Sequence, residues 1–297
     1  MSFNLNNYNE KLESNEILGL AVWWTIHGGR WSYEGITRKL TQVGLDSEYV
    51  QEETPRAVFS DAVKTASDQV DGCIFRKILD DPDRVVMKLI DERVNRETVK
   101  VRFDQHTTVA LDKDKETFGG EGPMADAVHR LFESYHGTVP DPKVRHAVCN
   151  ILRDHRAITL RPSGGIYFLP AEKAEVVKAV QAFLRDMKIG ELYILRIPNG
   201  VIERANTMES VSEDMTGRLD RLSKEVDLVN SRLSSLADKK AEAEEVKKLF
   251  DYYVKVLDGS EAVEALHQRY FDLEKKISKK IANFEAAKGR DVKKDKK

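Results

Sequence analysis

Apolar residues follow three kinds of spacing along the chain, and each kind predicts a different structure. Residues 17–26 are almost all apolar, rich in β-branched and aromatic side chains, and closed by Gly28 and Gly29, which favours a buried strand. Apolar residues then recur every three or four positions up to residue 66, as they do on amphipathic helices. Short apolar segments between residues 71 and 112 predict strands.

The two helices near the N-terminus have recognisable start signals. Ser32 can cap a helix that runs through Val43 and stops at Gly44. Thr54 followed by Pro55 is a second start signal, because proline is favoured at the first position of a helix. The apolar residues of this second helix are expected to face the core: Val58, Phe59, Ala62, Val63 and Ala66.

The region after residue 71 predicts an antiparallel meander, because turn-forming residues separate its apolar runs. The four predicted strands are residues 73–75, 85–90, 99–103 and 108–111. Gly119–Pro123 predicts a flexible joint and an internal boundary of the globular region. After the joint, the expected order is helix, helix, strand, strand, helix and strand, over residues 125–135, 142–154, 157–161, 166–169, 171–187 and 191–197.

Six apolar residues in the C-terminal part repeat with the alternating spacing of three and four that marks a coiled coil. They are Leu219, Leu222, Val226, Val229, Leu233 and Leu236. Gly259 predicts a helix stop, so two helices of about 50 and about 27 residues would fold back as an antiparallel hairpin. The overhang would leave residues 219–229 without a partner in the chain. The stripe therefore predicts a homo-oligomer or a helical protein partner.

Together these elements predict an α+β protein. A mixed α/β globular head with an antiparallel β-meander and a winged-helix-like unit would be followed by a long α-helical coiled-coil hairpin. The predicted divisions are an α/β N-terminal domain (1–118), a winged-helix-like α/β unit (119–205), the coiled-coil hairpin (206–287) and a basic disordered tail (288–297).

Composition argues against several classes of protein. The 48 basic and 50 acidic residues nearly balance, so the chain lacks the strong net charge that would indicate a nucleic-acid or membrane-surface protein. Cys73 and Cys149 lie far apart in predicted core segments, which indicates free thiols in a reducing compartment. The sequence shows no signal peptide and no apolar run of about 18 residues. The expectation is a cytoplasmic protein without membrane contact.

One segment of this balanced chain is locally basic. Between residues 142 and 169, five basic residues stand against Asp154, on a predicted helix and the hairpin after it. Two helices and a glycine-tipped hairpin resemble a winged-helix unit, whose second helix enters the major groove of DNA. An ordinary solvated helix face is the alternative, because the region as a whole is not basic. The candidate phosphate-binding residues are Lys143, Arg145, Arg153, Arg156 and Arg161.

No residue pattern indicates catalysis or a bound cofactor. His146 and Cys149 lie three apart on a predicted helix, but no CxxC or HxxxH pair accompanies them, so no metal site is expected. The chain has no G-x-S-x-G segment and no phosphate-binding loop. Cys149 has basic neighbours within one helical turn, and a buried structural cysteine is the simpler interpretation. The prediction is a protein that is not an enzyme and uses no cofactor.

Two stretches carry a family resemblance: TPRAVFSDAVKTA (54–66) and VRHAVCNILRDHRAITLRPSGGIYFLP (144–170). They resemble a family of phage and prokaryotic mobile-element proteins of unassigned function. The resemblance covers about residues 15–200, leaves the coiled coil aside and carries no catalytic residues. It implies a viral or plasmid context, with the cytoplasm of a host cell as the location. The matching residues are Pro55, Phe59, Ala62, Gly164, Gly165, Tyr167, Phe168 and Pro170.

Two functions are favoured by these patterns, and an enzyme with an unrecognised site is a third alternative. The first is a non-enzymatic phage or mobile-element protein that associates with DNA and oligomerises through its coiled coil. The alternative is a protein-interaction, scaffold or host-interference protein that acts through the coiled coil and binds no nucleic acid.

Overall fold

The computed structural model describes residues 17–70, 73–95, 100–161, 164–229, 233–259 and 263–294. These residues form a mixed α and β fold with antiparallel sheets. The chain separates into two compact units, and each is described by itself. The first unit comprises the chain up to Thr25, Asn150–Arg185 and the chain from Gly190 onward. The second unit comprises Ile26–Cys149 and Asp186–Ile189.

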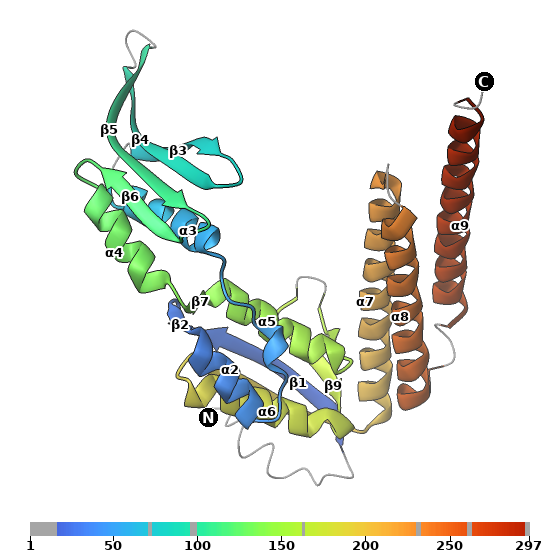
Figure 1. Ribbon diagram of the computed structural model, residues 1–297. Coiled ribbons are helices and arrows are strands. Elements are labelled where there is room, and N and C mark those ends of the chain that lie inside the picture. The colour runs from blue at the N-terminus through green and yellow to red at the C-terminus, as the bar shows by residue number, and fades with distance from the viewer. Residues whose placement is uncertain are drawn as a thin grey trace. The chain divides into compact units, whose positions relative to one another are not determined.

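A four-stranded antiparallel meander forms the larger sheet of the second unit (Figure 1). Helices α3 (Pro55–Ser67) and α4 (Ala125–Tyr135) share one apolar core with this sheet. All five residues predicted to face the core from α3 are buried there, and Thr54 Oγ1 caps the helix by accepting from Ala57 N at 3.3 Å. The strands are β3 (Cys73–Asp80), β4 (Arg84–Asn95), β5 (Lys100–Asp112) and β6 (Thr117–Glu121).

Two details of the predicted meander are wrong. The third and fourth predicted strands are one continuous strand, β5, and the fourth strand of the sheet occupies the predicted flexible joint. In β6, Gly119 pairs with Ala110 and Gly120 with Val109. A Cβ atom on Gly120 would lie 2.9 Å from the Cβ atom of Ala125. The glycine therefore permits close packing of α4 on the strand, rather than flexibility.

Of the remaining elements of the second unit, helix α2 follows its sequence signals closely. Helix α2 (Tyr33–Gln42) is capped by Ser32, whose Oγ accepts from Gly35 N at 3.2 Å. A short 3₁₀ helix, η2, covers Ser47–Tyr49. Strand β2 (Arg30–Ser32) pairs with β7 (Thr138–Pro140) in a two-stranded sheet, which the sequence did not predict.

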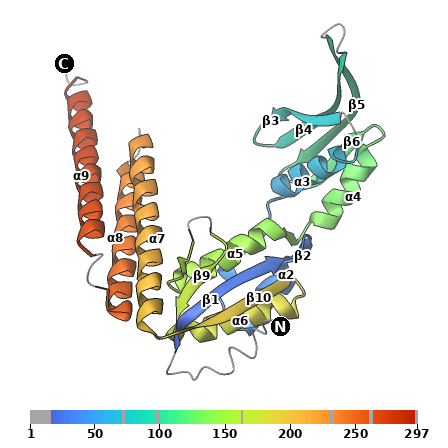
Figure 2. The same ribbon diagram turned by 180° about the vertical axis from the view of Figure 1, so that it is seen from behind.

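The sheet of the first unit has the strand order β10-β1-β9-β8 (Figure 2). Helix α6 (Ala174–Asp186), preceded by the 3₁₀ turn η3 (Ala171–Lys173), is tied to this sheet because Gln181 Nε2 donates to Leu192 O at 3.0 Å. Helix α5 (Asp141–Asp154) begins in the second unit and ends in the first. The strands are β1 (Ile17–Ile26), β8 (Ile158–Thr159), β9 (Tyr167–Pro170) and β10 (Gly190–Pro198).

The structure does not confirm a winged-helix unit. Strand β9 lies between β1 and β8, so the predicted wing hairpin is an integral part of a sheet. Helix α4 instead belongs to the apolar core of the second unit. The elements predicted to form one winged helix are thus distributed over both units.

Three helices, not two, form the C-terminal part of the first unit. They are α7 (Val201–Leu228), α8 (Leu233–Leu257) and α9 (Val263–Lys294). Glu225 near the end of α7 pairs with Lys239 near the start of α8, whereas Gly259 lies against Met208 near the start of α7. The two helices are therefore antiparallel. The sequence concealed this break because the apolar spacing continues across it and no glycine or proline lies between Leu228 and Leu233.

The apolar stripe that predicted self-association is buried within the chain. Leu219, Leu222, Val226 and Leu236 are at most 2% exposed, and Val229 packs partly buried against the same core. The side chain of Leu233 lies outside the described residues. The prediction that residues 219–229 lack an intramolecular partner is therefore wrong, because α8 and α9 both cover α7.

Helix α9 reaches the end of α7 and satisfies its last carbonyl groups. Lys280 Nζ donates to the carbonyl oxygens of Val226 and Asp227, the latter at 2.8 Å, and Lys276 Nζ donates to Ser223 O one turn earlier at 3.0 Å. The final carbonyl groups of a helix have no intrahelical partner, and a positive charge there also favours the helix dipole. Helix α9 continues to Lys294, so residues 288–294 of the predicted disordered tail are helical. Across the described ranges, no helix is both long and apolar enough to cross a membrane.

Candidate functional site

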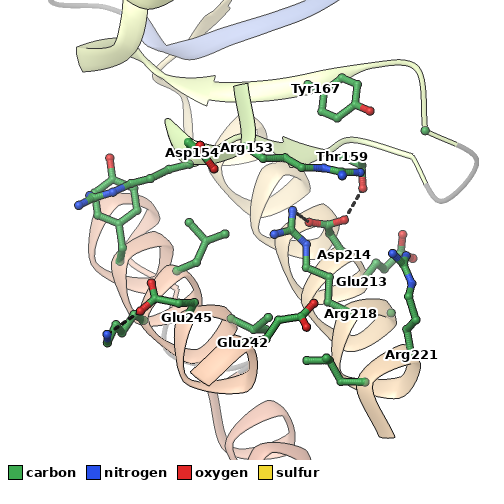
Figure 3. Close-up of a pocket in the computed structure, with 18 residues that line it drawn as sticks. Arg153, Asp154, Thr159, Tyr167, Glu213, Asp214, Arg218, Arg221, Glu242 and Glu245 are labelled. Atoms are coloured by element: carbon green, nitrogen blue, oxygen red, sulfur yellow. Dashed lines mark hydrogen bonds and ion pairs between the residues drawn. The ribbon is translucent and has the colours of Figure 1, made fainter. Parts of the chain in front are cut away.

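A cavity of about 870 Å³ opens in the first unit between the β8–β9 hairpin and the helices α7 and α8 (Figure 3). Because guanidinium groups come from several of its walls, we call it the arginine cleft. Its apolar and small lining residues include Tyr167, Gly164, Gly217, Leu222 and Tyr252. The charged groups that line it are Arg153, Asp154, Arg156, Glu213, Asp214, Arg218, Arg221, Glu242, Glu245 and Lys248.

Contacts between the hairpin and the helices fix the walls of the cleft. The ring of Phe168 on β9 lies 6.1 Å from that of Tyr253 on α8, centre to centre, and both side chains are fully buried. The Tyr253 hydroxyl donates to the carbonyl oxygen of Arg156 at 2.5 Å. Burial raises the pKa of Tyr253 well above its ordinary value, so this hydroxyl stays a donor at neutral pH.

Asp214 on α7 organises one side of the cleft (Figure 3). Its Oδ1 accepts from Thr159 Oγ1 at 2.5 Å, and its Oδ2 lies 2.7 Å from Nη2 of Arg218, one helical turn away. Oδ2 is buried and accepts no well-aligned hydrogen bond from any described residue, so the contact with Arg218 is an ion pair only. Arg218 Nη2 also donates to Ala157 O at 3.3 Å. The Arg218 guanidinium is thereby held in place.

Arg156 occupies a second wall. Its backbone adopts a φ of +73°, in the left-handed region that non-glycine residues rarely occupy, and its guanidinium carbon lies 4.0 Å from the centre of the Tyr252 ring. The Tyr252 hydroxyl donates to Glu172 Oε1 at 2.8 Å. Burial and this hydrogen bond raise the pKa of Tyr252 to about 12. The contact with the Tyr252 ring therefore holds the Arg156 guanidinium group in this wall.

Most acidic groups of the cleft already have a basic partner. Glu242 Oε2 lies 3.1 Å from Lys239 Nζ, and Glu245 Oε1 lies 2.7 Å from Lys248 Nζ. Asp214 is paired with Arg218, and Asp154 also interacts within the chain.

Two arginines of the cleft differ from these paired groups in having no partner for their charge among the described residues. Arg153 and Arg221 are exposed, and neither side chain makes a hydrogen bond, ion pair or ring contact with any residue in the described ranges. Glu213 is the acidic lining residue in the same condition. Once the paired charges are set aside, the open groups are Arg153 and Arg221 against Glu213, while Arg156 contacts Tyr252. The unpaired part of the cleft is therefore positive.

The five residues predicted to bind nucleic acid do not form one cluster. Arg153 and Arg156 line the arginine cleft, whereas Arg161 is exposed and does not line it. Lys143 and Arg145 lie in the second unit and are engaged there. Lys143 Nζ is 3.3 Å from Glu53 Oε1. Arg145 pairs with Asp141 at 3.4 Å and donates to Ile26 O at 2.5 Å.

A saturated arginine lies close to Lys143 in the second unit. Arg30 pairs with Glu53 and with Asp61 at 3.1 Å, and its Nε donates to Thr138 Oγ1 at 2.8 Å. Its guanidinium carbon also lies 4.3 Å from the centre of the Tyr135 ring. The Arg30 and Glu53 side chains are only 14% and 6% exposed. Each of the three side-chain nitrogen atoms of Arg30 thus has a partner, and the side chain is largely buried, which indicates a structural role.

Sequence reasoning missed the part of the cleft that α7 contributes. Asp214, Arg218 and Arg221 lie among charges of alternating sign, which are ordinary on the outside of a coiled coil. Gly217 was the available signal, because an isolated glycine in a helical pattern indicates a packing or functional reason.

The fold is that of a mixed α and β protein with a three-helix bundle and a cleft lined by arginines. The chain belongs to the family of unknown function DUF6744, whose model matches residues 17–294. The match includes helices α7 to α9, which the sequence resemblance left aside, and it does not show a viral or mobile-element origin. No curated protein and no solved structure matches significantly. Within the described residues, no three His, Cys, Asp or Glu side chains are placed to hold a metal ion.

Proposed function

We propose that the protein is a non-enzymatic nucleic-acid-associated protein whose first unit binds DNA through the arginine cleft. The observation that carries the proposal is that Arg153 and Arg221 line a cavity and that their guanidinium groups have no hydrogen-bond or ion-pair partner among the described residues. A guanidinium group presents five donors in a rigid fork that matches phosphate oxygens. Hydrogen bonds between these charged partners are about twice as strong as neutral ones.

The remaining charges of the cleft support an anionic ligand. Asp214 neutralises and orients Arg218, and lysines neutralise Glu242 and Glu245. An incoming phosphate therefore meets open guanidinium groups and one unpaired carboxylate, that of Glu213. The chain as a whole is nearly neutral, so this binding depends on a local site rather than on a broad basic surface.

The cleft replaces the predicted winged helix as the DNA-binding element. Lys143 and Arg145 are excluded from the proposed contact because each has partners in the second unit. The phage or mobile-element context implied by the sequence resemblance is consistent with a DNA-binding role. Self-association through α7 does not enter the proposal, because the residues that predicted it are buried.

A fluorescence anisotropy titration with a labelled DNA oligonucleotide tests the proposal. Arg153→Ala combined with Arg221→Ala removes two phosphate contacts, and we expect the affinity to fall by about tenfold or more at low salt. The slope of log affinity against log salt, measured between about 50 and about 200 mM, should decrease by about 2.

Lys224→Ala is the matched control for this experiment. Lys224 lies on α7 one turn beyond Arg221 and is exposed. Its side chain has no hydrogen-bond or ion-pair partner among the described residues and does not line the cleft. The control should bind like the unmodified protein. Absence of any binding at low salt, or an equal loss in the control, would contradict the proposal.

A further inference from the structure

A glycine in the middle of α7 leaves space in the wall of the arginine cleft. Gly217 lines the cavity, and a Cβ atom built on it would meet no other atom within 4 Å. Glycine in a helix interior is less stable than alanine at the same position. No close contact with another described residue explains why this position lacks a side chain. The glycine instead widens the cleft at this position.

The open position lies on one helix face with the unpaired charges. Glu213, Gly217 and Arg221 follow each other at intervals of four residues, which places them in one row along α7. Gly164, next to the β8–β9 hairpin, also lines the cleft, and a Cβ atom there would likewise meet no atom within 4 Å. Two walls therefore present bare backbone to the cavity.

The concave shape limits which form of DNA fits. Proteins that read duplex DNA insert a protruding helix or ribbon into a groove, and the major groove is about 12 Å wide. Arg153 and Arg221 lie on the walls of a cavity of about 870 Å³, which cannot enter a groove. A volume of that size suits a ligand with the dimensions of a few nucleotides, since ligand pockets span about 300–1,000 Å³. A single strand can enter such a cavity because its bases and phosphates are separately accessible.

We propose that the arginine cleft holds a single strand of nucleic acid. Arg153 and Arg221 bind its phosphates, and Gly217 leaves the space through which the strand passes along α7. This inference rests on the proposed function and specifies its ligand. It adds a role for Gly217 that phosphate binding alone does not require.

Two probes of one sequence separate the inference from the function on which it rests. A labelled single-stranded DNA oligonucleotide and its duplex are titrated against the full chain at low salt. We expect the single strand to bind at least about tenfold more tightly. Duplex binding as tight as single-strand binding would overturn the inference and leave the proposed function intact. Binding of neither probe would overturn both.

Substitutions of Gly217 test the open position directly. Gly217→Ala should raise the melting temperature, because alanine favours the helix, and yet weaken single-strand binding several-fold. Gly217→Leu should weaken binding further, because a larger side chain occupies more of the cavity. Lys224→Ala again serves as the control and should leave binding unchanged. Unchanged affinity in Gly217→Leu, or a lower melting temperature in Gly217→Ala, would contradict the assigned role.

Discussion

Arg30 in the second unit and Arg153 in the first carry the same guanidinium group in opposite surroundings. Arg30 is almost buried and contacts two carboxylates, a hydroxyl and an aromatic ring. Arg153 is exposed at a cavity and contacts none of the described residues through hydrogen bonds or ion pairs. A buried charge needs such partners because leaving water costs several kcal/mol per ion. Engaged donors thus indicate a structural arginine, whereas open donors mark the arginine that we propose to bind phosphate.

The largest expected effect comes from removing the saturated arginine. Arg30→Ala leaves the Glu53 carboxylate buried with Lys143 as its remaining partner. We expect the free energy of unfolding to fall by about 3 kcal/mol, the lower end for breaking a buried ion pair. Urea denaturation measures this loss. Arg38→Ala, which removes an exposed pair with Glu34, should cost less than about 1 kcal/mol. Similar losses of unfolding free energy in Arg30→Ala and Arg38→Ala would show that burial does not make the Arg30 contacts stronger.

A smaller effect on stability is expected where Tyr253 on α8 contacts Arg156, just before β8, in the first unit. Tyr253→Phe removes the hydrogen bond to the carbonyl oxygen of Arg156 and leaves that buried acceptor unsatisfied. The expected destabilisation is about 1–2 kcal/mol, measured by the same denaturation experiment. Tyr33→Phe offers a control because that tyrosine is only partly buried. An unchanged stability in Tyr253→Phe would show that the bundle does not need this bond to hold the cleft wall.

The stability of the second unit should depend on pH through Asp80, a carboxylate with several basic partners. Hydrogen bonds from Lys77 and Lys113 lower the pKa of Asp80 from its ordinary 3.8 to about 2, and the Arg56 charge acts in the same direction. Because the folded pKa is depressed, the stabilisation is complete above pH 3.8 and is lost as the pH falls toward 2. The wild type and Asp80→Asn should therefore differ in stability near neutral pH and converge in acid. A difference that persists below pH 2 would contradict this account.

The smallest effect on stability is expected where the donors are open. Arg153→Ala combined with Arg221→Ala should change the free energy of unfolding by less than about 0.5 kcal/mol, because neither side chain has an intramolecular partner among the described residues. Thermal and urea denaturation measure it. A loss comparable with that of Arg30→Ala would show that these arginines are structural after all and would remove the basis of the comparison.

Local signals in the sequence predicted individual elements well. Thr54 and Pro55 located the start of α3, and Ser32 located the start of α2, because caps and proline act within one turn of the chain. Glycines misled the interpretation where tertiary contacts decide their role. Gly120 lies in a strand beneath Ala125, although the sequence predicted a flexible joint there. The residues next to a glycine in the sequence cannot show whether it belongs to a flexible joint or to a closely packed strand.

The candidate site was only partly predictable for a related reason. A local excess of positive charge revealed Arg153 and Arg156. Arg218 and Arg221 lie about sixty residues further along the chain and enter the cleft only because α7 packs against β8 through Thr159 and Asp214. The spacing of apolar residues predicted that α7 would be helical, but a repeat that continued past Leu228 concealed the turn that lets α8 cover it.

The lysines of α9 that satisfy the end of α7 have a consequence for synthesis of the protein. Ser223 O and Asp227 O receive their donors from Lys276 and Lys280, about fifty residues later in the chain. On the ribosome, α7 and the arginines it carries emerge before the lysines that complete the helix. The last turns of α7 should therefore stay frayed until residue 280 has left the exit tunnel. The wall of the cleft that α7 forms is therefore completed only after α9 has been synthesised.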